Sequence, residues 1–190
     1  LDGALVSDGE SLRAIDQMFE GLVTLEPGGT EIGPALATEW EASDDGLAWT
    51  FTLREGVTFH DGTPLDAEAI KWNFDTLHLA DASLTAGAIR SAGVEEVAVV
   101  DELTVVYRLA EPNAAMPDLL TGAVGWPVSP TAYEEQGADD FNRSPVGTGP
   151  FLVGEPWTPD GQFVLRRNPD YWRTDEDGVQ LPYLDEVTFR

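Results

Sequence analysis

Every second side chain is large and apolar in the sequence WTFTLR at residues 49–54. Because side chains alternate between the two faces of an extended chain, this pattern predicts a β-strand with one buried face. The sequence Asp-Asp-Gly at residues 44–46 supplies the chemistry of a tight turn just before it. Residues 38–42 are therefore predicted to form the other arm of a β-hairpin.

Helical and extended patterns follow one another along the chain without regular alternation. Ser11 is predicted to cap a first helix that runs to Leu22, and Asp66 is predicted to cap a second helix with an apolar stripe. The pair Ser129-Pro130 predicts a third helix that closes at Gly137. Further extended patterns occur at residues 94–100, 103–109, 162–167 and 187–190. This mixture predicts an α/β fold class, with mixed α and β elements on an open mixed sheet, and argues against a barrel or a solenoid.

The charge balance is strongly acidic. Thirty-five Asp and Glu residues face ten Lys and Arg residues, which gives a formal net charge of −25. Such a surface repels phosphate groups, so no nucleic acid and no anionic membrane surface is expected as a partner. Two explanations for the acidity stay open, namely a high-salt habitat, where salt screens the repulsion, and codon bias in a GC-rich genome.

The chain contains no cysteine, which excludes disulfides, cysteine nucleophiles and thiolate metal sites together. Hydrophobic residues make up 42% of the sequence, enough for a packed core. No apolar run approaches the roughly 18 residues that a membrane-spanning helix needs.

Several segments together resemble the family 5 extracellular solute-binding proteins, the peptide- and nickel-binding receptors of ABC importers. The segments are PALATEW at 34–40, SDDG at 43–46, WTFTLREGVTFHDGTP at 49–64, DAEAIKWNF at 66–74, GTGPF at 147–151, RNPDYW at 167–172 and LPYLDEV at 181–187. The resemblance spans nearly the whole chain. Most residues of the 43–64 segment have turn, strand or capping chemistry, so its pattern is mainly architectural.

The resemblance implies a lobe like that of a type II periplasmic binding protein. Residues 1–190 are expected to form most of the first lobe, with an inserted subdomain within about residues 40–145, and the second lobe is expected to be absent. The sequence stops inside the extended pattern at 187–190, which also suggests truncation. The resemblance further implies an extracytoplasmic protein, either periplasmic or a cell-surface lipoprotein, whose signal segment lies outside this sequence.

The function that the resemblance implies is that of a solute-binding receptor subunit. Such a subunit binds peptides or similar small solutes in a cleft and delivers them to an ABC permease in the membrane. A monomer without a cofactor is expected, and not an enzyme. The alternative is a sensory or regulatory module that uses the same receptor fold without transport.

The candidate ligand-binding residues follow the first predicted helix and recur in two later loops. They are Gln17, Phe19, Glu20, Gly21, Trp126 and Thr148. Glu20 could hold a ligand ammonium through a charge-assisted hydrogen bond, although a glutamate at a helix end is more often solvated. Trp126 could offer an aromatic contact to a solute or could simply anchor its loop.

Metal-binding, phosphate-binding and catalytic sites have weaker support in the sequence. His60-Asp61 invites a metal site or a general base, but His78 is the only other histidine, and a metal site needs three or four converging ligands. The Gly147–Pro150 segment lacks the Lys of a phosphate-binding loop, which favours a backbone turn. No Gly-x-Ser-x-Gly sequence occurs, so no catalytic residue is predicted. No metal ligand is predicted either, because too few ligands converge.

Overall fold

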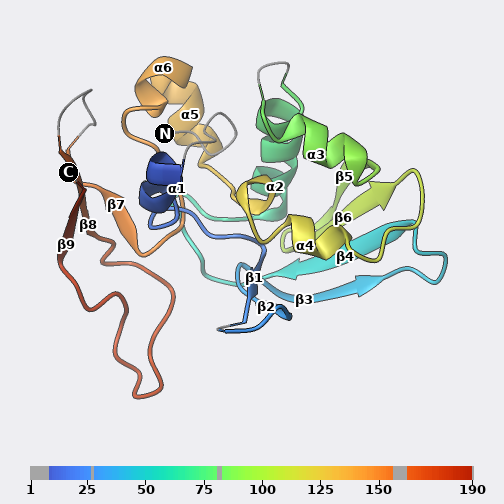
Figure 1. Cartoon of the computed structure of the whole chain (residues 1–190), viewed down its shortest axis with the longest axis horizontal. Coiled ribbons are helices and arrows are strands. Elements are labelled where there is room, and N and C mark those ends of the chain that lie inside the picture. Colours follow the sequence, from blue (N-terminus) through green and yellow to red (C-terminus); the bar gives the residue numbers. More distant parts are fainter. Residues whose placement is uncertain (1–8, 27, 81–82, 156–161, 190) are drawn as a thin grey trace. The chain divides into compact units, whose positions relative to one another are not determined.

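The computed structural model describes residues 9–26, 28–80, 83–155 and 162–189, with side chains from residue 12 onward (Figure 1). These residues form two compact units. Unit 1 contains the described residues up to Phe19, together with 56–65 and those from Val128 onward; unit 2 contains 20–55 and 66–127. In the part of the chain that the structure describes, no helix is both long and apolar enough to cross a bilayer.

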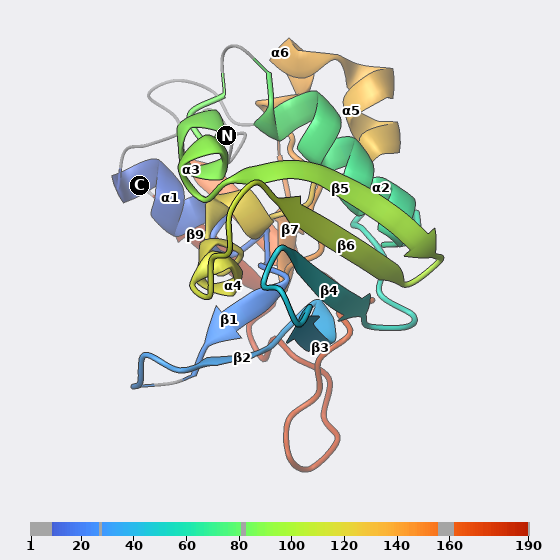
Figure 2. The same cartoon turned by 90° about the vertical axis from the view of Figure 1, so that its right-hand side faces the viewer.

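Unit 2 is built on a four-stranded antiparallel sheet in the order β3-β4-β6-β5. The strands are β3 Ala37–Ala42, β4 Ala48–Leu53, β5 Val94–Asp101 and β6 Thr104–Leu109. Helix α2, Ala67–Trp72, packs on β5 and β6, as Figure 2 shows. A two-stranded sheet of β1 and β2 accompanies it. The remaining elements are β1 Val23–Leu25, β2 Ile32–Pro34, η1 Asn73–His78, α3 Ala86–Ser91, α4 Met116–Leu119 and η2 Ala123–Gly125.

The core of unit 2 lies between the sheet and α2 with η1. Phe51 on β4 is fully buried, and its ring meets that of Tyr107 on β6 edge-on at 5.5 Å between centroids. The ring of Phe74 also meets that of Tyr107 edge-on, at 6.4 Å between centroids. Burying one such side chain stabilises the fold by about 1.5–3 kcal/mol, so this aromatic group is a major part of what holds the sheet to the helix.

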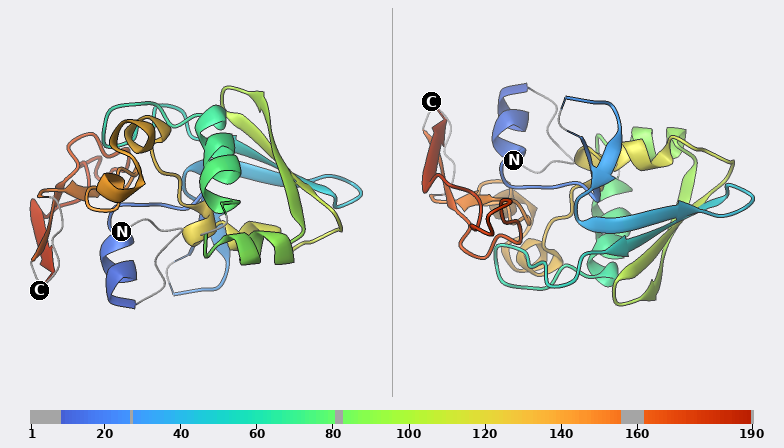
Figure 3. Two further views of the ribbon diagram at one scale, coloured as in Figure 1. Left: turned by 90° about the horizontal axis from the view of Figure 1, so that it is seen from above. Right: turned by 90° about the horizontal axis from the view of Figure 1, so that it is seen from below.

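Unit 1 contains a three-stranded antiparallel sheet in the order β7-β8-β9 and three short helices (Figure 3). Residues 56–65 add a loop closed by an isolated bridge between Thr58 and Pro64. The elements are α1 Gly9–Ile15, α5 Pro130–Gln136, α6 Ala138–Phe141, β7 Phe151–Val153, β8 Phe163–Arg167 and β9 Glu186–Phe189.

Patterns that depend on neighbouring residues are confirmed. The predicted hairpin appears as β3-β4, and the extended patterns at 94–100 and 103–109 form the paired strands β5 and β6. Gly46 takes the positive φ of 69° that its turn requires. Asp66 and Ser129 cap α2 and α5, accepting hydrogen bonds from the backbone N–H of Ala69 at 2.8 Å and of Ala132 at 3.1 Å. The α/β class of mixed helices and strands is also confirmed.

Two predictions are corrected. The first helix begins at Gly9 and ends at Ile15, so Ser11 lies inside it and Leu22 lies well beyond it. Turn hydrogen bonds continue after Ile15 as far as Phe19, and the carbonyls of Gln17 and Met18, which a helix running on to Leu22 would need, accept hydrogen bonds from a distant segment instead. The open mixed sheet is also wrong for the described residues, which form three separate antiparallel sheets. Short turns join β3 to β4 and β5 to β6. Such turns suffice for antiparallel neighbours, whereas parallel neighbours need a long crossover connection.

The helix predicted after Asp66 changes its hydrogen-bonding pattern midway. Residues 67–72 are α-helical, and residues 73–78 continue as a π-helix. The side chain of Asn73 donates to the carbonyl of Ala69 at 2.9 Å at this junction. The assignment of residues 1–190 to one lobe, with a subdomain inserted at about 40–145, stays a prediction.

We expect Asp66→Ala to lower the free energy of unfolding by about 1 kcal/mol, because it leaves the first turn of α2 without its cap. The matched control is Asp75→Ala, which removes the same charge from an exposed ion pair with Lys71. That pair is worth about 0.5 kcal/mol or less. Urea unfolding of both variants measures the difference, and equal losses would contradict the capping role.

Candidate functional site

The predicted ligand-binding residues divide between the two units. Gln17, Phe19 and Thr148 belong to unit 1, whereas Glu20, Gly21 and Trp126 belong to unit 2. In sequence, Phe19 and Glu20 flank one of the points at which the chain passes from one unit to the other.

The unit 1 set is brought together by backbone pairing. We call residues Gly147, Thr148 and Gly149 the glycine bend. The backbone N–H of Gly149 donates to the carbonyl of Met18 at 2.9 Å, and that of Phe151 donates to the carbonyl of Gln17 at 3.0 Å. The segment after α1 and the glycine bend therefore form one backbone-paired structure, with Thr148 buried in it.

Glycine is required at both ends of the bend because the two backbones touch. A Cβ atom on Gly147 would lie 2.3 Å from the carbonyl oxygen of Met18, and one on Gly149 would lie 2.5 Å from the carbonyl carbon of Met18. Neither distance is possible for non-bonded atoms. The expected backbone turn at 147–150 is therefore a close-approach device, which explains its glycines without any phosphate.

His60 uses both of its ring nitrogens to hold the bend. Its Nδ1 accepts from the backbone N–H of Gly147 at 3.3 Å, and its Nε2 lies 3.0 Å from the carbonyl oxygen of Gly149. A carbonyl can only accept, so Nε2 carries the proton and the imidazole is neutral. Burial lowers the pKa of His60 to about 4, outweighing the opposing effects of the Gly149 hydrogen bond and of Asp61. A second side chain, the buried Asn168, donates to the same Gly149 carbonyl at 3.1 Å.

Asp61 joins the loop of unit 1 to helix α5. Its carboxylate accepts from the hydroxyl of Ser129 at 2.5 Å, and from the backbone and hydroxyl of Thr63 at 2.9 and 2.6 Å. Partial burial raises the pKa of Asp61, but the hydrogen bonds from Ser129 and Thr63 outweigh it and hold the pKa below its ordinary value. Ser129 is fully buried and caps α5, so this Asp-Ser pair is a structural joint.

The unit 2 set has a different character. Gly21 is tightly enclosed, since a Cβ there would lie 2.4 Å from the carbonyl oxygen of Leu120. Glu20 is half-buried, and Trp126 keeps only 8% of its surface exposed. This burial fits the alternative in which Trp126 anchors its loop. Contact of Glu20, Gly21 and Trp126 with a solute stays a prediction.

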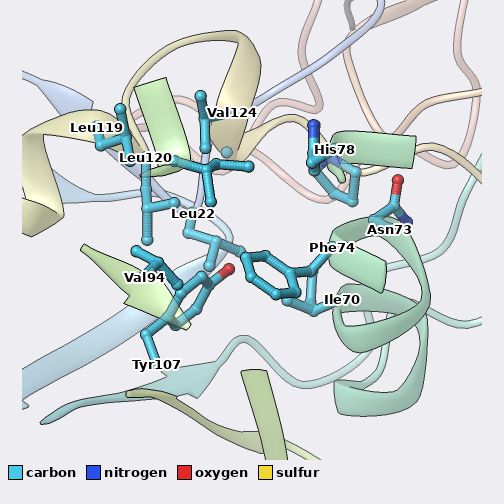
Figure 4. A pocket seen from close by; sticks show the side chains of 13 residues that line it. Leu22, Ile70, Asn73, Phe74, His78, Val94, Tyr107, Leu119, Leu120 and Val124 are labelled. Carbon is cyan, nitrogen blue, oxygen red and sulfur yellow. The ribbon is translucent and has the colours of Figure 1, made fainter. Parts of the chain in front are cut away.

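An apolar cavity lies within unit 2 between the sheet, α2 with η1, and the 119–127 segment (Figure 4). Its volume is about 10 Å³, enough for about one water molecule and far too small for a peptide. His78 lines it and bonds through Nδ1 to the hydroxyl of Thr85 at 2.9 Å. Burial lowers the pKa of His78 to about 4. The cavity is therefore a feature of core packing.

Sequence reasoning missed the role of His60 and Asn168. The sequence suggests His60 only as a metal ligand or a general base, and the described residues contain no cluster of three or more metal-binding side chains. Its partners lie 87 and 89 positions away, so no local spacing connects them. The one available signal was the pair of glycines at 147 and 149, which marks a close backbone approach but not its partner.

These features agree with what comparison with known proteins shows. The chain belongs to the bacterial extracellular solute-binding proteins, family 5, whose model matches residues 31–190. It is 33% identical to the glutathione-binding protein GsiB of Salmonella paratyphi A over 190 residues, covering 100% of this chain and 35% of the relative. The chain thus spans about a third of the length of that curated relative.

Solved structures give the same result. The periplasmic binding protein DppA from Helicobacter pylori, in complex with the peptide STSA, has a TM-score of 0.80 at 31% identity, covering 98% of this chain and 39% of that protein. MoaA from A. tumefaciens R10, in complex with mannopinic acid, has a TM-score of 0.87 at 28% identity, covering 99% and 37%. The predicted family and the predicted type of fold are both confirmed.

We expect Gly149→Ala to destabilise the chain by about 1–3 kcal/mol, because the added methyl group overlaps the backbone of Met18. The control is Gly87→Ala on α3, where a Cβ meets nothing within 4 Å. That change should stabilise the helix by about 0.5–1 kcal/mol. Thermal unfolding of both variants tests the contrast. A neutral Gly149→Ala would show that the close approach does not exist.

Acidification should weaken the fold through the histidines. Their pKa is about 4 in the folded chain, below the ordinary value of about 6.5. Their contribution to stability is therefore complete above about pH 6.5 and is lost as the pH falls toward 4. The slope approaches about 1.4 kcal/mol per pH unit for the buried His78, because its imidazole is protonated in the unfolded chain and neutral in the folded one in this range, and His60 acts in the same direction. Proton NMR should find both imidazoles neutral at about pH 5.5 in the folded chain, and charged in urea. Midpoints near 6.5 in the folded chain would contradict this.

Proposed function

We propose that this chain acts as the solute-binding receptor of an ABC importer, outside the cytoplasm, and that it binds a peptide or similar small solute for delivery to a membrane permease. The observation that carries the proposal is membership of the family over residues 31–190. The match to solved binding proteins with a peptide and with mannopinic acid bound supports it. A periplasmic or lipid-anchored monomer is part of the proposal.

The proposed solute contacts are the six residues predicted from the sequence. In unit 1, the paired backbones of Gln17–Phe19 and the glycine bend form a fixed platform. In unit 2, Glu20 offers a half-buried carboxylate suited to the ammonium group of a peptide. Backbone recognition of this kind tolerates varied solute side chains, which suits a receptor for a class of peptides.

The roles of the histidines and of Ser129 support binding over catalysis. A hydrolase of the serine type needs an exposed hydroxyl beside an imidazole that is free to accept its proton. Ser129 is buried, donates to Asp61 and caps a helix. The ring of His60 is committed to the glycine bend, and that of His78 is buried against Thr85. Both histidines therefore act in the structure.

NMR titration of the uniformly ¹⁵N-labelled chain with L-alanyl-L-alanine and with glutathione tests the proposal. We expect shifts of the amide resonances of Gln17–Gly21 and Thr148, with a Kd in the millimolar range for a chain of this length. The N-acetylated dipeptide, which lacks the ammonium group, should bind more weakly to the wild type. It should bind equally well to the wild type and to Glu20→Gln. If neither compound at about 20 mM shifts these resonances, the proposed function is wrong.

A further inference from the structure

The glycine bend is held from both sides. On one side, the backbone N–H groups of Gly149 and Phe151 donate to the carbonyls of Met18 and Gln17. On the other side, the imidazole of His60 bonds the N–H of Gly147 and the carbonyl of Gly149. The backbone N–H of His60 also donates to the carbonyl of Gly147 at 2.9 Å. His60 therefore makes three hydrogen bonds to a segment of three residues.

Few side chains could replace this imidazole. The bend presents one donor and one acceptor that must be met by a single rigid group. A neutral imidazole has one acceptor and one donor nitrogen on opposite sides of its ring, and it loses little rotational freedom on binding. Lysine and arginine only donate, and an ionised carboxylate only accepts. Asn168 donates a second hydrogen bond to the Gly149 carbonyl and so supports only one end of the bend.

We propose that His60 is a positioning residue for solute binding, which fixes the glycine bend and, through it, the backbone of Gln17–Phe19. This inference rests on the proposed function, because Gln17, Phe19 and Thr148 are its proposed solute contacts. His60 does not touch the solute itself. Its effect is to order these contacts before the solute arrives, so that binding does not have to order them.

The hydrogen-bond partners of His60 require a neutral ring. The charge of Asp61 favours the protonated ring, but burial outweighs it, and the carboxylate of Asp61 accepts hydrogen bonds from Ser129 and Thr63. Protonating Nδ1 would turn an acceptor into a donor that faces the N–H of Gly147. The neutral form with the proton on Nε2 is thus the one form that satisfies both partners, and it can be observed directly.

The experiment uses His60→Ala, with His60→Asn and His60→Gln as partial replacements and His78→Gln as the matched control. The amide of Asn can accept near the place of Nδ1, and the amide of Gln can donate near the place of Nε2. His78→Gln alters the other buried histidine, which contacts Thr85 in unit 2 and not the bend. Three quantities are measured: the protonation of the ring nitrogens by ¹⁵N NMR, amide hydrogen exchange at Gly149 and Phe151, and affinity for L-alanyl-L-alanine.

In the wild type we expect an unprotonated Nδ1 and a protonated Nε2 on His60. His60→Ala should speed exchange at Gly149 and Phe151 and weaken dipeptide binding, each by about tenfold. The Asn and Gln variants should fall between the Ala variant and the wild type. His78→Gln should lower the Tm while leaving both exchange rates and the affinity unchanged.

Each other outcome has a defined meaning. Unchanged amide exchange at Gly149 and Phe151 in His60→Ala would overturn the role of His60 in fixing the glycine bend. A proton on Nδ1 in the wild type would do the same. Faster exchange with unchanged affinity leaves the proposed function intact and overturns the positioning role. If the wild type binds no dipeptide, the proposed function fails at that step, and the positioning role fails with it. If His60→Ala does not fold, the Asn and Gln variants and the wild-type ring nitrogens decide.

Discussion

The contact between two backbones at Met18 and the glycine bend organises unit 1. Since no side chain fits between them, the approach needs glycine at 147 and 149, and it leaves the bend without side chains of its own at these positions. The bend is therefore held by groups from elsewhere, namely His60 and Asn168. The same contact takes up the carbonyls of Gln17 and Met18, which a helix running on to Leu22 would need for its own N–H groups. The close approach at Met18 thus explains why α1 does not run on to Leu22, why residues 147 and 149 are glycines, and why His60 holds the bend.

The sequence predicted what neighbouring residues decide. Alternation at 49–54 and the turn before it predicted the β3-β4 hairpin, and the capping chemistry of Asp66 and Ser129 predicted two helix starts. The end of α1 could not be predicted, because it depends on hydrogen bonds to residues about 130 positions away. For the same reason, the candidate site was predicted as a set of residues but not as an arrangement. The pairing of Gln17–Phe19 with the bend is visible only in the three-dimensional structure.

The acidic composition hid specific roles for individual carboxylates. Asp45, Asp61 and Asp175 each accept backbone N–H groups within the loops that they begin, and Asp66 does so at a helix start. The pKa of Asp45 lies below its ordinary value, through hydrogen bonds from Ser43 and from the backbone of Leu47. In a chain with 35 acidic residues, these few cannot be recognised by residue type. They are recognised by the turn residues that follow them, such as Gly46 and Gly62.

The structure also explains why the fold and the solute are separate questions. The hydrogen bonds that hold the glycine bend run between backbone atoms, or from a side chain to the backbone, as at His60 and Asn168. Such contacts place a surface without specifying what it binds. Relatives of the same fold accordingly hold a tetrapeptide in one case and mannopinic acid in another. Selectivity for a solute is therefore a question of side chains, and among the six proposed contacts the charged one is Glu20, in unit 2.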